Sequence, residues 1–390
     1  MSKNLAILGS TGSIGCQAVE VCLQLGLRVK GLTFNRNVEA VLPQIESLRP
    51  DLVATPDERA AFALAKRLRE RGGDAPEILT GAAGVAAVAS APELDMVLLA
   101  ISGFASIGPA MAAARAGHDL ALASKEAIIV AGPLLQAEME RNNARIIPVD
   151  SEHSAIWQCL RTGRKEDLAK IWLCASGGPF LGRSYDELRA VTPEEALRHP
   201  TWQMGKRITI DSATMVNKGL EIIEACRLFD VQPEQVEVVI HPQSVIHSMV
   251  EWADHSVIAQ LSAPDMRLPI QIALTVPERL PGSAVPFDPF KLNRLTFVEP
   301  DPLVFRALPL AYEAARCGGS LPLTYNAADE VAVAAFLAGE LSFTGITELI
   351  ERVMDRHMAA DFTQPASAEE LFELDAKVRE DARQMRHNIK

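Results

Sequence analysis

Leu5-Ala-Ile-Leu-Gly-Ser-Thr-Gly-Ser-Ile-Gly15 decides the fold, because it joins a short apolar run to a turn that contains three glycines. The apolar run predicts a buried strand, and the glycine turn opens a helical pattern that stops near Gly26. In a strand–turn–helix unit, backbone N–H groups and the helix N-terminus can face a pyrophosphate. The spacing G-x-x-G-x-x-G is a variant of the usual dinucleotide fingerprint. Its place at the start of the chain, before a second strand at 27–34, favours a nucleotide site over a merely tight loop.

The end of the second predicted strand reads Asn35-Arg36-Asn37 and holds no acidic residue. A carboxylate there would bind the adenine ribose 2′-hydroxyl and indicate NAD. Arg36 can pair with a 2′-phosphate instead. We therefore predict NADPH as the cofactor, with an ordinary exposed arginine as the alternative.

Strand and helix patterns alternate from this point to Asp150. This alternation predicts a mostly parallel, doubly wound sheet in a Rossmann-like, NADPH-binding domain over residues 1–150. Ser124 follows a strand end and is expected to cap the next helix. Lys125 beside it is either exposed in that helix's first turn or meets a substrate oxygen.

Pro148-Val-Asp-Ser-Glu-His153 closes this module with two carboxylates. In an extended segment, Asp150 and Glu152 would point to the same side at the carboxyl end of a strand, where open α/β sheets bind ligands. A third carboxylate, Glu221, lies in a segment rich in small hydrogen-bonding residues. Three oxygen ligands suit Mg²⁺ or Mn²⁺, with Co²⁺ as a further candidate, and do not suit zinc. Taken alone, Asp-x-Glu is more often a solvated strand end.

Residues 151–276 predict a central α+β catalytic domain. A strand at 171–175 runs into Ser176-Gly-Gly-Pro179, whose N–H groups can face an anion or simply form a turn. The loop 198–205 carries Trp202, which suggests either a lid that closes over substrate or a loop packed permanently on the core.

Residues 211–229 read as one helix, on which Asn217 and Glu221 share a face one turn apart. The alternative for this helix is a surface ion pair between Lys218 and Glu221. Strands at 236–240, 244–252 and 257–261 predict an antiparallel sheet and a candidate dimer face. A proline-rich linker is expected at 277–302, followed by a C-terminal helical bundle over 303–390.

Length, composition and net charge limit the classes of protein to which the chain can belong. The chain has 390 residues, of which 48% are hydrophobic, so more than one domain is expected. A formal net charge of −12 argues against nucleic acid or an anionic membrane as a partner. Six scattered cysteines without a C-x-x-C motif indicate reduced thiols and a cytoplasmic protein. We expect neither a signal peptide, since the first apolar run is too short, nor a membrane span.

Seven motifs occur in one order along the chain: Gly9-Ser-Thr-Gly-Ser-Ile-Gly15, Ser124-Lys-Glu126, Pro148-Val-Asp-Ser-Glu-His153, Ser176-Gly-Gly-Pro-Phe180, Arg198-His-Pro-Thr-Trp-Gln-Met-Gly205, residues 211–221, and His241-Pro-Gln-Ser-Val-Ile-His-Ser-Met249. Together they resemble the 1-deoxy-D-xylulose 5-phosphate reductoisomerase family over essentially the whole chain.

The resemblance implies roles for residues that match the family's motifs. Those expected to contact NADPH are Thr11, Gly12, Ser13, Ile14, Asn37, Glu126 and Gly205. Those expected to hold the metal are Asp150, Glu152 and Glu221. Those expected to contact the substrate are Lys125, Ser151 and Glu152 at its reacting end, Ser176, His199, Ser212, Asn217 and Lys218 at its phosphate side, Trp202 as the lid, and also Glu221. Lys125, His199 and the three carboxylates are the expected catalytic residues.

Two positions depart from the family pattern: Asn35 stands in place of a glycine and Ser124 in place of an asparagine. Both keep the polarity of the site, so we expect altered NADPH affinity with activity retained.

The family implies a homodimeric, NADP-dependent oxidoreductase with an intramolecular isomerase step. It would rearrange 1-deoxy-D-xylulose 5-phosphate and reduce the product to 2-C-methyl-D-erythritol 4-phosphate, in the non-mevalonate (MEP) route to isoprenoid precursors. Without the resemblance, the residues predict only a metal-dependent NADPH reductase that acts on a small phosphorylated compound. A plain NADP-dependent sugar-phosphate dehydrogenase and a non-catalytic NADPH sensor are the alternatives.

Overall fold

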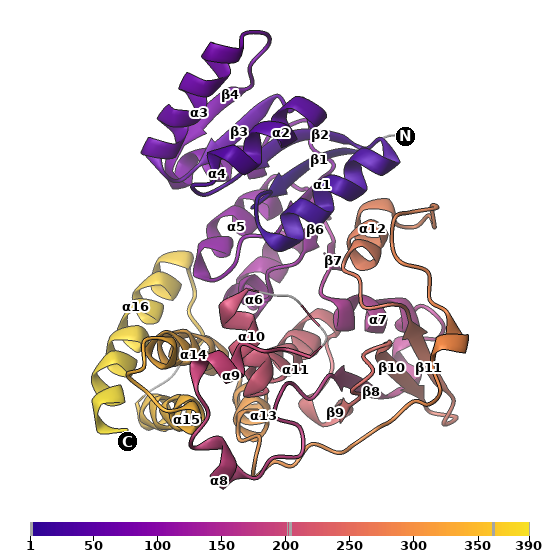
Figure 1. The fold of residues 1–390 in the computed structure, drawn as a ribbon, viewed down its shortest axis with the longest axis vertical. Helices are drawn as coiled ribbons and strands as arrows, with labels where there is room; N and C mark the ends of the chain where they lie inside the picture. The colour runs from indigo at the N-terminus through magenta and orange to yellow at the C-terminus, as the bar shows by residue number, and fades with distance from the viewer. Residues whose placement is uncertain (1–2, 201, 203–204, 361–362, 390) are drawn as a thin grey trace. The chain divides into compact units, whose positions relative to one another are not determined.

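The structure is a computed structural model that describes residues 3–200, 202, 205–360 and 363–389. By their internal contacts, the residues form two compact units (Figure 1). The first unit comprises Met1–Ala127, Leu135–Ser154 and Asp265–Val285, and the second comprises Ile128–Leu134, Ala155–Pro264 and Pro286–Lys390. The domain boundaries expected at 150, 276 and 302 remain a prediction.

The first unit is built on a seven-stranded parallel sheet, which confirms the doubly wound α/β prediction. Its strands are β1 (Asn4–Leu8), β2 (Arg28–Thr33), β3 (Leu52–Thr55), β4 (Glu77–Thr80), β5 (Met96–Leu99), β6 (Asp119–Leu122) and β7 (Ile146–Pro148). The strand order is β4-β3-β2-β1-β5-β6-β7. The order changes direction between β1 and β5, and ligands bind at such a switch point in sheets of this kind.

The helices of the first unit follow the strands in the expected alternation. They are α1 (Ser13–Leu25), α2 (Val38–Leu48), α3 (Glu58–Arg71), α4 (Gly81–Ala89), η1 (Phe104–Ser106), α5 (Ile107–Arg115), most of α6 (Lys125–Arg141), the start of α7 (Ser151–Leu160) and α12 (Arg267–Thr275). The sequence did not predict α4, because its small apolar residues show no polar face and hence no helical period. It also missed α12, which packs against α1.

The second unit contains a four-stranded sheet with the order β11-β10-β8-β9. Its strands are β8 (Leu168–Ala175), β9 (Val236–Ile240), β10 (Ile246–Trp252) and β11 (Val257–Leu261). The antiparallel sheet predicted from the strands at 236–240, 244–252 and 257–261 is correct for β10 and β11, which pair antiparallel, but not for β9, which pairs parallel to β8. β8 lies between β9 and β10 and is antiparallel to β10. Since β8 carries the fully buried Ile171 and Leu173, it takes an inner place where both of its edges are paired.

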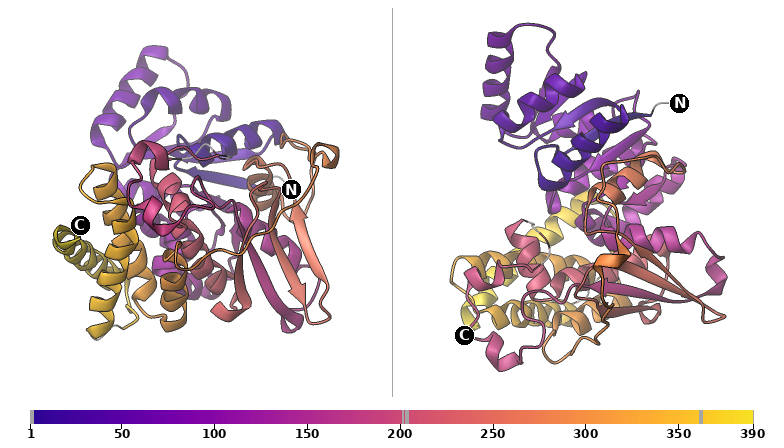
Figure 2. Two further views of the ribbon diagram at one scale, coloured as in Figure 1. Left: turned by 60° about the horizontal axis from the view of Figure 1, so that its bottom comes forward. Right: turned by 45° about the vertical axis from the view of Figure 1, so that its right-hand side comes forward.

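The second unit also contains helices, the last four of which form the C-terminal part of the chain. They are α8 (Tyr185–Leu188), α9 (Pro193–Ala196), α10 (Lys206–Ala213), α11 (Val216–Phe229), α13 (Ala307–Cys317), α14 (Leu321–Leu337), α15 (Phe343–Ala359) and α16 (Ala368–Met385), with single turns η2 (Lys165–Asp167), η3 (Pro233–Gln235), η4 (Pro289–Lys291) and η5 (Arg386–Asn388). Helices α13 to α16 confirm the predicted helical C-terminus and lie on the other side of the second unit from the sheet strands β10 and β11 (Figure 2).

The prediction of one helix over 211–229 is wrong, because α10 ends at Ala213 and α11 begins at Val216. Met215 between them has a left-handed backbone with φ of 63°. Thr214 supports the break, since its Oγ1 donates to the carbonyls of Ile210 and Asp211 and accepts from the N–H of Val216. The break turns the chain between two segments that both carry predicted site residues.

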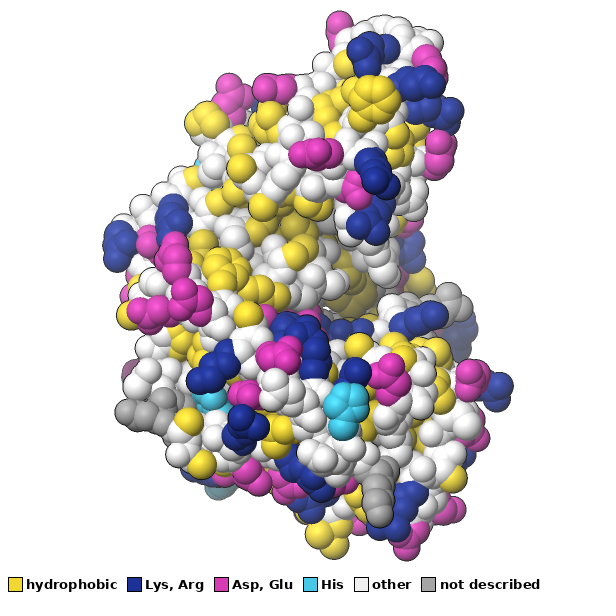
Figure 3. Space-filling view, turned by 90° about the vertical axis from the view of Figure 1, so that its left-hand side faces the viewer, with side chains coloured by type: hydrophobic (Ala, Val, Ile, Leu, Met, Phe, Trp, Pro, Cys, Tyr) yellow, Lys and Arg dark blue, Asp and Glu magenta, His cyan; other side chains and the backbone are white. Residues whose placement is uncertain are grey.

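No helix in the described part of the chain is long and apolar enough to cross a membrane. On the face that Figure 3 shows, basic and acidic side chains are intermingled.

Candidate active site

The glycine turn after β1 is so tight that no side chain would fit at Gly9 or Gly15. Gly9 has φ of 84°, and a Cβ atom there would lie 2.6 Å from the carbonyl oxygen of Ala100. A Cβ atom on Gly15 would lie 2.2 Å from the carbonyl oxygen of Gly9. Gly12 is the N-cap of α1 and makes no side-chain cap, which leaves the first N–H groups of the helix to an outside partner. Thr11, Ser13 and Ile14 flank this N-terminus, as predicted from the motif.

β2 is followed by the buried Phe34 and then by Asn35, Arg36 and Asn37, which are exposed. The Arg36 guanidinium forms a 2.9 Å ion pair with Asp57, and its side chain is 81% exposed. Asn37 caps α2, since its Oδ1 accepts from the N–H of Ala40. The Asn35 carbonyl accepts from the Thr55 hydroxyl. Arg36 is thus a surface residue that already has a partner, and a 2′-phosphate would have to compete with Asp57 for it.

Ser124 does not cap α6, so that expectation is wrong. Its hydroxyl donates to the carbonyls of Leu99 and Ile101, which lie at the end of the neighbouring strand, and is therefore not directed at the helix N–H groups. Glu126 accepts a 3.0 Å hydrogen bond from the N–H of Gly103 and so fixes the loop after β5. Both side chains are buried.

Lys125 is buried as well, which removes the alternative of an exposed residue in the first helical turn. Its Nζ lies 2.8 Å from Oδ2 of Asp150. Since both side chains are nearly enclosed, the pair is shielded from solvent and its attraction is stronger than at a surface.

Asp150 and Glu152 are not in an extended segment, so the predicted geometry is wrong although the residues lie near one another. β7 ends at Pro148, and the Asp150 carbonyl already accepts from the N–H of Ser154, as an N-cap residue does. Glu152 therefore lies in the first turn of α7, where its carboxylate accepts from the Ser151 hydroxyl.

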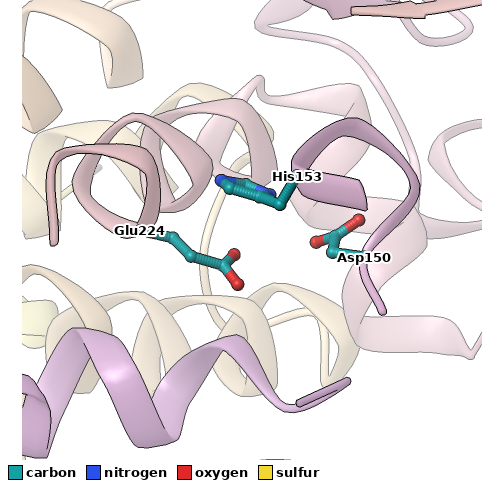
Figure 4. Close-up of side chains that lie close together, drawn as sticks. All are labelled: Asp150, His153 and Glu224. Atoms are coloured by element: carbon teal, nitrogen blue, oxygen red, sulfur yellow. The ribbon is translucent and has the colours of Figure 1, made fainter. Parts of the chain in front are cut away.

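Two groups of side chains offer ligand atoms that lie within 4.8 Å of one another: Asp150 with Glu152 and Glu221, and Asp150 with His153 and Glu224. In the second group, the carboxylates of Asp150 and Glu224 point toward each other beside the His153 ring (Figure 4). The first group is the predicted ligand set. His153 and Glu224 were not predicted, but Glu224 follows Glu221 by three residues and so shares its helix face, a signal that could have found it.

Ser176, His199 and Ser212 come together in the second unit. His199 Nε2 lies 3.2 Å from the Ser176 hydroxyl and 3.1 Å from the Ser212 hydroxyl. Its Nδ1 accepts a 2.9 Å hydrogen bond from the N–H of Trp202, which places the proton of the neutral ring on Nε2. Burial lowers the pKa of His199 and favours this neutral ring. The ring therefore orients two hydroxyls with one N–H.

The Ser176 turn packs closely on the end of α10. Gly177 and Gly178 have φ of 85° and 65°. A Cβ atom on Gly178 would lie 2.9 Å from the Ser212 carbonyl oxygen, so only glycine permits this approach. The Ser-Gly-Gly motif is therefore a turn that brings Ser176 beside Ser212.

The side chains of Asn217 and Lys218 both reach Glu221 on α11. Asn217 Nδ2 donates to one Glu221 oxygen, and Lys218 Nζ lies 2.5 Å from the other. Lys218 and Glu221 are 4% and 1% exposed, so the alternative of a surface ion pair is wrong. A buried carboxylate and ammonium, together with a half-buried amide, form a polar site on one face of the helix, because burial of charged groups is costly without such partners.

The predicted lid is only partly within the described residues. Trp202 is half-buried, and its ring centroid lies 6.4 Å from that of His247. Gly205 is exposed at the N-cap of α10. Thr201, Gln203 and Met204 of the same loop lie outside the described residues, so closure of a lid stays a prediction.

The parallel sheet, its glycine turn and the carboxylate group place the chain in the class of dinucleotide-binding α/β enzymes. Three family models match it: the 1-deoxy-D-xylulose 5-phosphate reductoisomerase model over residues 5–132 and the two C-terminal domain models of that enzyme over residues 146–229 and 261–381. The chain belongs to the 1-deoxy-D-xylulose 5-phosphate reductoisomerase family.

Individual relatives agree with this assignment. The chain is 50% identical over 376 residues to the 1-deoxy-D-xylulose 5-phosphate reductoisomerase of Pelotomaculum thermopropionicum, covering 96% of both chains. It is 51% identical over 359 residues to that of Heliobacterium modesticaldum, covering 92% of this chain and 91% of the relative.

Solved structures of the family have the same fold. A crystal structure of a DOX-P reductoisomerase in complex with NADPH, fosmidomycin and magnesium superposes with a TM-score of 0.92 at 38% identity, over 99% of this chain and 98% of that one. The Zymomonas mobilis enzyme in complex with NADPH gives a TM-score of 0.92 at 37% identity, over 99% of both chains.

Proposed function

We propose that the protein converts 1-deoxy-D-xylulose 5-phosphate to 2-C-methyl-D-erythritol 4-phosphate, using NADPH and a divalent cation, in the non-mevalonate route to isoprenoid precursors. The observation that carries this proposal is the carboxylate group Asp150, Glu152 and Glu221, whose ligand atoms lie within 4.8 Å of one another. It occurs in a chain that is half identical to enzymes named for this reaction.

The three carboxylates fit a hard divalent cation, since Mg²⁺ and Mn²⁺ prefer oxygen ligands. Asp150, Glu152 and Glu221 would hold the ion. When bound, such an ion supplies Lewis-acid stabilisation of oxygen charge during the rearrangement. Lys125 would orient Asp150 through their 2.8 Å ion pair and present an ammonium to substrate oxygens at the reacting end. Ser151, hydrogen-bonded to Glu152, would also contact that end.

The substrate phosphate would bind among Ser176, Ser212, His199, Asn217 and Lys218. The first two offer hydroxyl donors that the neutral His199 ring orients. Lys218 offers a buried ammonium, whose charge would be shared between Glu221 and an incoming phosphate. Binding far from the reacting carbons supplies energy that the enzyme can use to position them, with Trp202 closing over the substrate.

NADPH would bind at the glycine turn, with its pyrophosphate on the N-terminus of α1 at Thr11, Gly12, Ser13 and Ile14. Asn35, Arg36 and Asn37 would meet the ribose 2′-phosphate side, and Ser124, Glu126 and Gly205 would line the remainder. The cofactor supplies the hydride for the reduction. Glu126 holds Gly103 in place and so shapes the loop beside the nicotinamide.

The test is NADPH oxidation by purified protein with 1-deoxy-D-xylulose 5-phosphate, after chelation and then with Mg²⁺ or Mn²⁺ restored. We expect turnover only with the ion, and a branched methylerythritol phosphate by mass and NMR. Asp150→Asn removes one anionic ligand, and we expect it to lower kcat/KM by about 10²-fold or more, since loss of even an outer-shell partner of a metal ligand costs about 10–100-fold. Full activity in the chelated protein would favour a plain dehydrogenase, and NADPH binding without turnover would favour a sensor.

We propose further that the protein is a cytoplasmic homodimer. The edge strand β11 supports the dimer, because Val257, Ile258 and Leu261 are exposed on it. The six cysteines, all among the described residues, form no disulfide with one another, which supports a reducing compartment. Sedimentation of the wild type beside a Val257→Lys, Ile258→Lys variant tests the dimer: a shift to monomer supports this face, and an unchanged dimer excludes it.

A further inference from the structure

Arg207, at the start of α10, lies at the centre of a charged network in the second unit. Its guanidinium reaches three residues of α14: Glu330 at 2.8 Å, Asn326 at 3.0 Å and Asp329 at 3.2 Å. These residues are spaced i, i+3 and i+4, so they form one face of that helix. Asp211, one turn further along α10, lies 3.5 Å from the Arg207 Nε.

The network continues to the last long helix. Arg379 of α16 pairs with the other Glu330 oxygen at 2.8 Å and with Asp375 at 2.6 Å. Asp329 is fully buried and Asp211 nearly so. Burial raises the pKa of Glu330, but Arg207 and Arg379 outweigh it, so the net shift is downward and the carboxylate stays charged. Such ions are retained in an interior only when their geometry is well defined.

Helix α14 also supports α11. Tyr325, beside Asn326 in sequence, is fully buried, and its hydroxyl donates to the Ala307 carbonyl. A Cβ atom on Gly219 would lie 2.4 Å from that hydroxyl oxygen, so a glycine at 219 lets α11 pack directly on Tyr325 of α14. The two helices that carry the phosphate-side residues therefore share one support.

We propose that Arg207 is a positioning residue for phosphate recognition. It ties α10 to α14 and thereby sets Ser212 at the correct distance from Asn217 and Lys218 on α11. Arg207 itself would not touch the substrate, because its donors are directed at the carboxylates and amide of the network. This inference rests on the phosphate site of the proposed function and extends it to the C-terminal helices.

The test is the effect of Arg207→Gln on two phosphate-dependent quantities. One is the KM for 1-deoxy-D-xylulose 5-phosphate and the other is the dissociation constant of inorganic phosphate, measured by ³¹P NMR titration. We expect both to rise about tenfold, the factor that one weakened hydrogen bond of about 1.4 kcal/mol produces, while kcat falls less. A protein that is only partly folded would lose kcat in proportion to the inactive fraction and keep its KM.

Three further variants complete the design. Arg207→Lys keeps the charge but loses the planar fork, so its KM should lie between those of the wild type and Arg207→Gln. Asn326→Ala removes one neutral acceptor and serves if Arg207→Gln does not fold. Arg316→Gln is the matched control, since Arg316 is an exposed arginine paired to Glu234 at 2.9 Å, away from α10.

Unchanged KM and phosphate affinity in a folded Arg207→Gln or Asn326→Ala protein would overturn the proposal, as would an equal effect of Arg316→Gln. Failure of the proposed function looks different: the wild type would then show no turnover. The phosphate titration would still report whether Arg207 shapes an anion site.

Discussion

At the scale of single residues, His199 is expected to make the stability of the protein pH-dependent. Burial lowers its pKa below the ordinary 6.5, and the neutral ring accepts from the Trp202 N–H. Unfolding therefore takes up a proton at low pH. The His199 contribution to stability is fully present above pH 6.5 and is lost as the pH falls from there through the folded-state pKa.

His199→Gln should remove this contribution, because an amide both donates and accepts but does not titrate in this range. We expect the difference in melting temperature between the wild type and His199→Gln to shrink from pH 7.5 to pH 5. Other titrating groups cancel in the comparison, since both proteins carry them. A difference that stays constant over this range would show that His199 keeps an ordinary pKa.

At the scale of elements, a proline in α6 is matched by an arginine from α11. Pro133 has no N–H, so the Ile129 carbonyl loses its usual helical donor. Arg227 supplies one: its Nη1 donates to the carbonyls of Ile128 and Ile129. Gly132 makes room, because a Cβ atom there would lie 2.8 Å from the Arg227 side chain.

We expect Arg227→Met to lower the free energy of unfolding by about 1–3 kcal/mol, the cost of a buried polar group left without its partner. Pro133→Ala should partly restore stability in the Arg227→Met background, because residue 133 regains an N–H for Ile129. Urea unfolding of the two single variants and the double variant measures this coupling. Additive effects would mean that Arg227 does not substitute for the missing helical bond.

Some helices and strands could be predicted from the sequence and others could not. Glycine spacing and apolar runs predicted the parallel sheet and the helical C-terminus, because those patterns depend on local chemistry. The break at Met215 has no such signal, since the apolar period continues through it. An antiparallel sheet was predicted for β9, β10 and β11, but β8, with its buried Ile171 and Leu173, lies between β9 and β10 and pairs parallel to β9.

The candidate site was likewise predictable only in part. Motifs supplied the candidate residues, and the fold brings three of them, Ser176, His199 and Ser212, together. They did not predict the Lys125–Asp150 pair or the helical setting of Glu152, because side-chain partners depend on how separate elements pack. Nor did they indicate Arg207, whose partners on α14 lie more than a hundred residues away in the chain.

At the scale of the whole molecule, the chain returns to its first unit late, over residues 265–285. This return is held by Lys3, whose Nζ donates to the carbonyls of Leu274 and Val276 at 3.2 and 3.1 Å. A lysine suits the C-terminal end of α12, where free carbonyls carry partial negative charge. Burial is the largest influence on the Lys3 ammonium and lowers its pKa.

Lys3→Met should therefore loosen this segment first. We expect amides of residues 267–276 to exchange with solvent about tenfold faster, since one charge-assisted hydrogen bond contributes about 1.5 kcal/mol. Hydrogen exchange read by mass spectrometry measures this, with Lys66→Met as the control because Lys66 is exposed and its nearest carboxylate, on Glu70, lies 3.9 Å away. If exchange rises equally across the seven-stranded sheet, Lys3 stabilises the whole unit; if α12 alone responds, the late segment is a separately opening part of it.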